Sequence, residues 1–241
     1  MIVYGHRGAR GEAPENTIAG ARHAFDRGVR HLEIDLRLSA NGKLVVVHDN
    51  TVKRTAGGRG KIGDFSSREL ATMDARCDGP PWPNKRHTGI PTLSALVKAL
   101  PGIRHWQLEL KSGGKRYNEQ LAAAVVDWLN RHRLNAVVTS LEPTLLSAVK
   151  QQRPVQATGF VSELSDPDAV LENCGCDHLI AHWPTLTSAR QVKQWQQRGI
   201  HVSAWTVNDA SVIKHLFELG VDSVITDYPS MALPLVASLQ R

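Results

Sequence analysis

Short apolar runs alternate with longer amphipathic segments along this chain. Runs rich in aliphatic and β-branched residues predict strands at 2–5, 31–36, 44–48, 105–110, 135–139, 155–160, 177–181, 200–205 and 222–226. Segments with helical spacing of their apolar residues separate most of these strands, at 16–28, 92–100, 118–131, 143–151, 166–173, 187–198, 209–219 and 228–239. Strands that alternate with helices of this length are typical of parallel βαβ units.

The segment LEIDLRLSANGKLVVVHD departs from this alternation. Between Asp35 and His48 there is no room for the crossover that two parallel strands need, so residues 44–48 must return antiparallel as a hairpin arm. Asn41-Gly42 predicts a two-residue turn, and that turn would place Asp35 opposite His48. Without the arm, eight parallel strands remain, which predicts an α/β fold of the (βα)8 TIM barrel type.

The chain of 241 residues suits a single barrel domain over 1–241. Residues 51–90 are rich in Gly and Pro, and we interpret them as an insertion over the C-terminal mouth of the barrel. They hold eight Lys and Arg against four acids, and the whole chain has a formal net charge of +6. Because Phe65 and Trp82 alone interleave these charges, a solvated basic loop is favoured and no nucleic-acid partner is expected.

Composition is that of an ordinary globular protein, with 41% apolar and 22% charged residues. No run approaches the roughly 20 apolar residues of a membrane span. The strand-like start at residue 2 leaves no room for a signal peptide, so we expect a cytoplasmic location. Three cysteines, an odd number, argue against a disulfide framework and predict buried free thiols.

Acidic residues at the ends of two predicted strands form a candidate metal site. Glu33 and Asp35 leave one face of their strand, and Glu109 ends the next strand of the barrel. Three oxygen donors suit Ca²⁺ or Mg²⁺, whereas zinc would favour a histidine-rich set. The alternative is a salt-bridged network with Arg7 and Lys111. Three acids at the mouth of a packed barrel repel one another, which favours the cation.

Two histidines are expected beside this centre. His6 ends the first strand and His48 ends the hairpin, and two imidazoles of near-neutral pKa can divide the proton transfers of a hydrolysis. A single histidine could instead merely hydrogen-bond an acid. Arg7 and Lys111 suit an anionic oxygen, and Trp205 either fills the barrel end or forms an apolar wall.

Other polar residues have structural explanations. Asp227 is expected to cap the last helix, with Pro229 in its first turn. Histidines at predicted strand starts lie at the opposite end of the barrel from its mouth and are interpreted as structural: His31, His105 and His201.

The motifs that carry these residues resemble those of the glycerophosphodiester phosphodiesterase family. They follow the family's order along the whole chain: HRG at 6–8, APENT at 13–17, EID at 33–35, VVHD at 46–49, IPTL at 90–93, ELK at 109–111, WTVN at 205–208, GVD at 220–222 and ITDYP at 225–229. The resemblance implies a distorted TIM barrel with a small insertion after the histidine-bearing hairpin. It also implies hydrolysis of a small-molecule glycerophosphodiester to sn-glycerol 3-phosphate and an alcohol, assisted by Ca²⁺ or Mg²⁺.

Roles carried over by motif agree with the residue chemistry. The resemblance implies that His6 and His48 are an acid/base pair and that the metal ligands are Glu33, Asp35 and Glu109. It also implies that Arg7 and Lys111 bind the phosphate and that Trp205 is a wall of the glycerol site. The chain departs from the family at Leu141, where many members have Phe, and at Ser94, where they have an acid. Neither position touches the proposed chemistry, but Leu141 leaves the alcohol preference open.

Three other functions remain as alternatives. One is a lysophospholipase D-type activity on lysophospholipids, which an apolar insertion would favour, although residues 51–90 are polar and basic. Another is a metal amidohydrolase, which would need His-x-His on the first strand, where only His6 stands. The third is a non-catalytic barrel that binds a phosphorylated metabolite. A paired set of histidines argues against this last function, because binding alone needs no proton transfer.

Overall fold

Eight parallel strands close into a barrel in the computed structural model, which describes residues 1–82 and 88–241. The hydrogen-bonded order around the ring is β1-β2-β4-β5-β6-β7-β8-β9, and β9 pairs with β1. These strands are β1 (Ile2–His6), β2 (His31–Leu38), β4 (His105–Leu110), β5 (Ala136–Ser140), β6 (Thr158–Ser162), β7 (His178–His182), β8 (His201–Trp205) and β9 (Ser223–Thr226). The predicted (βα)8 barrel is confirmed.

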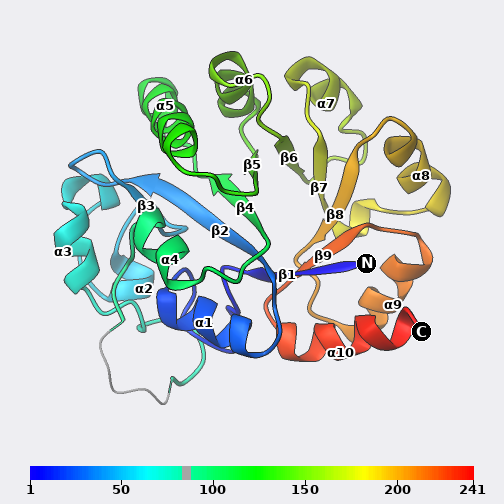
Figure 1. The fold of residues 1–241 in the computed structure, drawn as a ribbon, viewed down its shortest axis with the longest axis horizontal. Coiled ribbons are helices and arrows are strands. Elements are labelled where there is room, and N and C mark those ends of the chain that lie inside the picture. Colours follow the sequence, from blue (N-terminus) through cyan, green and yellow to red (C-terminus); the bar gives the residue numbers. More distant parts are fainter. Residues whose placement is uncertain (83–87) are drawn as a thin grey trace.

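Helices surround the strands and carry the chain from the end of one strand to the start of the next (Figure 1). Polar caps begin several of them: the Thr17 hydroxyl accepts from Gly20 N at 3.0 Å, and Asp209 accepts from two backbone amides. Pro229 stands in the first turn of the last helix, as predicted. The helices are α1 (Ile18–Asp26), α4 (Leu93–Ala99), α5 (Lys115–Arg131), α6 (Pro143–Gln152), α7 (Asp168–Cys174), α8 (Ala189–Gln197), α9 (Ala210–Glu218) and α10 (Pro229–Leu239), with a short 3-10 turn η2 (Trp183–Thr185).

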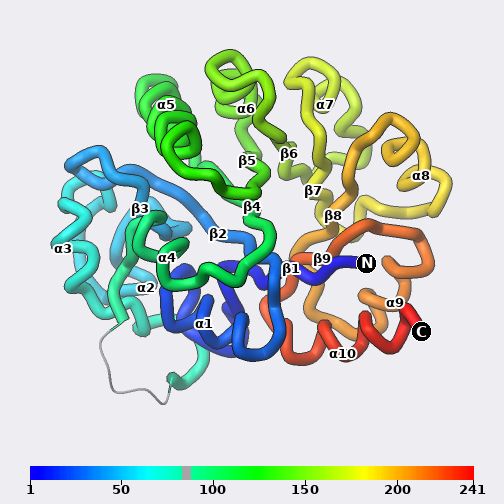
Figure 2. The backbone as a smooth tube through the Cα atoms, in the orientation of Figure 1, coloured from blue at the N-terminus to red at the C-terminus, as the bar shows by residue number. Residues whose placement is uncertain are grey.

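The chain travels once around the ring, so its last elements return to its first (Figure 2). Ile2 N donates to Asp222 O at 2.8 Å, and α10 packs against β1. Residues after β9 therefore lie next to residues after β1, although more than 200 positions separate them in the sequence. In the described ranges, none of the helices has the length and apolar character to cross a membrane.

The hairpin arm forms as predicted, but its turn is one residue longer. β3 (Leu44–Val46) runs antiparallel to the end of β2, with Leu38 opposite Leu44. Ser39 N donates to Lys43 O at 3.0 Å, and Gly42 has φ +68°. Three-residue hairpin loops end in such a left-handed residue, which glycine adopts readily. The predicted two-residue turn is therefore wrong.

This extra loop residue shifts the register of the arm by one position. Asp35 O accepts from Val47 N at 3.0 Å, so Val47 and not His48 stands across from Asp35. A one-residue shift would turn His48 to the opposite face if the strand continued. The strand ends at Val46, however, and Arg37 Nε holds His48 O at 2.8 Å. The chain bends there, and the imidazole still lies close enough to Asp35 for a direct electrostatic interaction.

Side chains of β2 alternate between the layer of helices outside the barrel and the interior of the barrel, and both are buried. Leu32, Ile34 and Leu36 are at most 1% exposed and pack against the surrounding helices. Glu33 and Asp35 point the other way, into the barrel. Because both faces of this strand are buried, its two acids are buried carboxylates, not surface charges.

The described part of the insertion, residues 51–82 and 88–90, packs beside the arm. Short helices α2 (Lys53–Ala56), η1 (Ile62–Asp64) and α3 (Ser67–Thr72) form a small apolar cluster with Val45 and Val47. Residues 83–87, which include the basic Lys85 and Arg86, lie outside the described residues. The placement of this insertion over the barrel mouth stays a prediction.

Cysteines are free thiols, as predicted. Cys174 and Cys176 are buried, but Cys77 is exposed, so the expectation of burial was wrong for that residue. The small apolar cluster of the insertion includes Ala75 but not Cys77.

Candidate active site

Three carboxylates meet inside the C-terminal end of the barrel. Glu33 and Asp35 point inward from β2, and Glu109 lies on β4 directly across from Asp35. One oxygen atom from each residue lies within 4.8 Å of the other two. The three residues are 3%, 1% and 9% exposed, respectively. Parallel pairing of β2 with β4 thus brings the three predicted metal ligands together.

Two cations share this centre. Lys111 Nζ lies 3.0 Å from Asp35 Oδ1 and also pairs with Glu109, while Arg7 Nε lies 3.2 Å from Asp35 Oδ2. Burial alone would raise the pKa of the Asp35 carboxyl, but the charges of Lys111 and Arg7 hold it well below its usual range. Ion pairs with both predicted phosphate-binding residues therefore accompany the acidic cluster.

The donor set fits a divalent cation. Glu33 Oε2 accepts from Arg7 N at 3.0 Å, but Glu33 Oε1 is buried and has no hydrogen-bond partner among the described residues. Burial raises the pKa of Glu33, and repulsion from Asp35 and Glu109 raises it further. An unpartnered buried oxygen beside two more carboxylates offers the all-oxygen surroundings that Ca²⁺ and Mg²⁺ favour.

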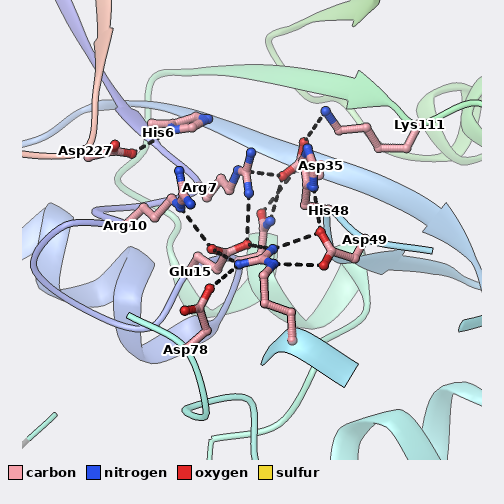
Figure 3. Close-up of polar contacts among 12 residues, drawn as sticks. His6, Arg7, Arg10, Glu15, Asp35, His48, Asp49, Asp78, Lys111 and Asp227 are labelled. Atoms are coloured by element: carbon pink, nitrogen blue, oxygen red, sulfur yellow. Dashed lines mark hydrogen bonds and ion pairs between the residues drawn. The ribbon is translucent and has the colours of Figure 1, made fainter. Parts of the chain in front are cut away.

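His6 lies between this centre and a fourth carboxylate. Its Nδ1 is 2.6 Å from Asp227 Oδ1 (Figure 3), and its Nε2 is 3.8 Å from Glu33 Oε2. Asn208 Nδ2 donates to the other oxygen of Asp227 at 2.7 Å. Burial would raise the pKa of Asp227, but the hydrogen bond from His6 lowers it. Asp227 therefore orients the ring so that Nε2 faces the acids.

The expectation that Asp227 caps the last helix is wrong. Tyr228 is the residue that precedes α10, and in the first turn Ser230 N donates to Glu12 Oε1 at 2.8 Å, not to Asp227. Asp227 instead faces the barrel because β9 pairs with β1, which places Asp227 beside His6. The sequence pattern alone could not distinguish a helix-capping aspartate from one that faces the barrel.

His48 forms a second histidine–carboxylate pair on the other side of the centre. Its Nδ1 lies 2.8 Å from Asp49 Oδ1 (Figure 3). Burial lowers the pKa of His48, and the neighbouring Asp35 carboxylate opposes this shift. The ring side chain is 35% exposed, so it remains open to a ligand from the mouth. The two predicted catalytic histidines thus share one arrangement, with a carboxylate at Nδ1.

The loop after β1 holds two residues in the left-handed conformation. Arg7 has φ +50° and Asn16 has φ +54°, which is uncommon for residues other than glycine. Asn16 Nδ2 donates to Asp35 Oδ2 at 2.7 Å, and the Asn16 side-chain oxygen accepts from Asp35 N at 3.3 Å. These bonds to the acidic strand hold the strained positions in place.

Trp205 lines a narrow cavity that continues from the acids into the barrel. Its indole Nε1 donates to Ile180 O at 3.0 Å, so the ring is held by the neighbouring strand. His6, Glu33 and Glu109 line the same cavity. The predicted apolar wall therefore adjoins the candidate chemistry.

Comparison with known proteins points to one family. The sequence model of the Glycerophosphoryl diester phosphodiesterase family matches residues 6–231 of the chain. The chain belongs to this phosphodiesterase family. The match begins at His6 and includes Asp227, so both histidine–carboxylate pairs lie inside it.

Relatives of this phosphodiesterase cover nearly its whole length. A glycerophosphodiester phosphodiesterase of Caldanaerobacter subterraneus subsp. tengcongensis is 29% identical over 98% of this chain and 97% of its own. A phosphodiesterase of Oleispira antarctica, solved in complex with the product sn-glycerol-3-phosphate, superposes with a TM-score of 0.86 at 29% identity, covering 98% of this chain and 97% of its own. A glycerophosphodiester phosphodiesterase from Agrobacterium tumefaciens superposes with a TM-score of 0.80 at 25% identity, covering 96% and 98%.

Several polar residues of this family member escaped the sequence reading. Asp227, Asn16 and Glu15 all contact predicted site residues, and Arg54 does so through carboxylates. Their only sequence signal was membership of the quoted motifs, or of the basic insertion in the case of Arg54. Spacing could not show which of these side chains point into the barrel.

Proposed function

We propose that this chain hydrolyses glycerophosphodiesters to sn-glycerol 3-phosphate and an alcohol. One observation carries the proposal: two histidines, each backed by a carboxylate at Nδ1, lie beside the three-carboxylate centre at the C-terminal mouth of the barrel. A hydrolase of a phosphodiester needs one group to accept a proton and another to donate one. The sn-glycerol-3-phosphate bound to the Oleispira protein supports the choice of substrate.

Binding of the phosphodiester falls to the two cations. Arg7 offers a planar guanidinium and Lys111 a compact ammonium, and both already lie against Asp35. They can hold the nonbridging oxygens and stabilise the negative charge that develops as the P–O bond breaks. Trp205 forms the wall against which the glycerol carbons pack.

Proton transfer falls to His6 and His48. With a carboxylate accepting from Nδ1–H, the Nε2 atom of a neutral ring carries the free electron pair. One imidazole takes a proton from the attacking hydroxyl through Nε2, and the other, protonated, gives a proton to the leaving oxygen. The attacking hydroxyl belongs to water or to the glycerol 2-position, in which case water opens a cyclic phosphate in a second step.

Glu33, Asp35 and Glu109 would hold a divalent cation, Ca²⁺ or Mg²⁺. When bound, such an ion supplies positive charge that polarises the phosphoryl group. Lys111 and Arg7 both pair with Asp35, whereas the cation would give the buried, unpartnered Oε1 atom of Glu33 a positive neighbour.

Release of glycerol 3-phosphate from glycerophosphocholine, with and without a chelator, tests the proposal. We expect turnover that the chelator abolishes and that added Ca²⁺ or Mg²⁺ restores. Turnover of lysophosphatidylcholine in place of glycerophosphocholine would point to the lysophospholipase D alternative. Phosphate binding without turnover of any glycerophosphodiester would instead indicate the non-catalytic alternative.

A further inference from the structure

A single arginine of the insertion uses all its donors on three carboxylates. Arg54 on α2 donates from Nε and Nη2 to Asp49 at 2.8 and 2.9 Å, and from Nη1 and Nη2 to Glu15 at 2.8 Å each. Nη1 also donates to Asp78 at 2.5 Å. These five bonds match the five N–H groups of a guanidinium. A lysine could not reproduce this planar set of donors.

Two of these carboxylates lead directly to predicted site residues. Asp49 Oδ1 accepts from His48 Nδ1 at 2.8 Å, and Glu15 Oε1 accepts from Arg7 Nη1 at 3.0 Å (Figure 3). Asp78 bonds to the same guanidinium, and its side chain is 40% exposed. Arg54 therefore stands between His48 and Arg7, and its partners are not the three candidate metal ligands.

Arg54 lowers the pKa of both carboxylates, chiefly through its hydrogen bonds to them. Its hydrogen bonds are the main reason that the pKa of Asp49 lies well below its usual range. Burial would raise the pKa of Glu15, which is 6% exposed, but Arg54 and Arg7 together lower it. An ionised carboxylate can only accept, so His48 Nδ1 must carry the hydrogen and Nε2 stays free for catalysis.

We propose that Arg54 is a positioning residue that acts through Asp49 and Glu15 on His48 and Arg7. Its catalytic consequence rests on the proposed function, but its effect on His48 does not. Through Asp49 it fixes the imidazole in the Nδ1–H tautomer. Through Glu15 it holds the Arg7 guanidinium at the phosphate position. The insertion thus takes part in the active site through one side chain.

Nitrogen NMR of the imidazole rings tests the first effect without any substrate. With the His48 signal assigned from a His48→Gln variant and the ring neutral, we expect the Nδ1–H tautomer in the unmodified protein. Arg54→Gln and Arg54→Lys both lose the planar pair of donors that holds the Asp49 carboxylate against Nδ1, so both should move His48 towards the Nε2–H tautomer that free imidazole favours. Asp78→Asn is the matched control and should leave the tautomer unchanged. An unchanged Nδ1–H tautomer in both Arg54 variants would overturn the proposal.

Steady-state kinetics with glycerophosphocholine test the second step. Arg54→Gln should lower kcat/KM by about 10–100-fold, because the acid/base group is worth about 10²–10⁴-fold and only its orientation is lost. If Arg54 acts through Asp49, combining Arg54→Gln with Asp49→Asn costs less than the product of the two single losses. Fully multiplicative losses would overturn the proposal.

Folding and activity are controlled separately. Circular dichroism melting confirms that each variant is folded, and Arg54→Lys retains the charge if Arg54→Gln does not fold. Absence of turnover in the unmodified protein would refute the proposed function, while the tautomer measurement would still decide the role of Arg54.

Discussion

At the scale of single residues, the site depends on the carboxylate that hydrogen-bonds to Nδ1 of each histidine. His6 and His48 come from different elements, yet each has an aspartate within 2.8 Å of Nδ1. Asp227 directly follows the last strand, β9, and Asp49 directly follows His48 in the chain. Each carboxylate accepts at Nδ1 and so sets which ring nitrogen carries the hydrogen when the imidazole is neutral, which is what the proposed acid/base roles require.

Removing either imidazole should reduce turnover without unfolding the protein. His6→Ala and His48→Ala are each expected to lower kcat on glycerophosphocholine by about 10²–10⁴-fold, the usual worth of positioned acid/base catalysis. The exposed His215 on α9 provides a control, and His215→Ala should keep normal turnover. Near-normal turnover in both test variants would show that other groups move the protons.

Replacing the carboxylate behind His6 should have a smaller effect of the same kind. Asp227→Asn keeps the size of the side chain but removes the charge that orients Nδ1–H. We expect kcat to fall by about 10–100-fold with little change in KM, because the ring remains but loses its preferred tautomer. A change confined to KM would assign Asp227 to substrate binding instead.

Metal binding can be measured apart from activity. Glu33→Gln removes the charge of the carboxylate whose Oε1 atom lacks a partner among the described residues. Calorimetric titration with Ca²⁺ or Mg²⁺ should show affinity weakened by about 10-fold or more, because affinity in oxygen sites follows ligand charge. Equal affinity of Glu33→Gln and the unmodified protein would place the ion elsewhere.

At the scale of elements, the hairpin shows how one loop residue changes a register. Ala40 joins Asn41 and Gly42 in the turn, which ends with Gly42 at φ +68°, and the ladder then pairs Leu36 with Val46. His48 reaches the site because β3 ends at Val46, before the ladder can turn the imidazole away. The arm is a short strand followed by a bend, and the bend, not the strand pairing, brings His48 to the site.

The conformation of the turn predicts a stability difference between two glycines. Gly42→Ala should lower the free energy of unfolding by about 1–2 kcal/mol, because a β-carbon is disfavoured in the left-handed region. Gly63 in η1 also has open space around it, but its φ is not positive, so Gly63→Ala should be nearly neutral. Urea unfolding of both variants checks this, and equal midpoints would contradict it.

At the scale of the whole molecule, the barrel has two polar ends. Its mouth holds the acids, and the opposite end holds a row of histidines from four strands: His31, His105, His178 and His201. Neighbouring rings in this row have centroids 4.8–6.5 Å apart. We expected three of these histidines at this end, and the structure adds His178 to them: His31, His105 and His201.

Burial of these rings predicts a loss of stability in acid. Desolvation lowers the pKa of His178 to about 3 and that of His105 to about 4, against 6.5 for the unfolded chain. As the pH falls below about 6.5, the unfolded chain binds protons that the folded chain does not. The stabilisation that the neutral buried rings contribute is therefore fully present above pH 6.5. It is lost progressively as the pH falls towards the pKa values of the folded state. His178 alone should cost about 2 kcal/mol between neutral pH and about pH 5.

Urea unfolding at both pH values measures this loss. His178→Gln removes one titrating ring, so it should reduce the difference between the two pH values by about 2 kcal/mol. His215→Gln, on the exposed surface of α9, should not change that difference. A pH difference that is the same in His178→Gln and in the unmodified protein would show that these rings do not titrate as argued.

The sequence by itself determined the order of strands and helices, the hairpin and the set of acids, because these depend on local periodicity and on which strand ends carry polar residues. The contact between Asp227 and His6 lay beyond it, because the pairing of β9 with β1 brings these two residues together and the sequence pattern alone suggested a helix cap for Asp227. The register of the arm and the contacts of Arg54 were decided in the same way, by loop geometry and by packing between segments far apart in the chain. Local patterns state which residues are polar, and only the tertiary structure decides which polar groups meet.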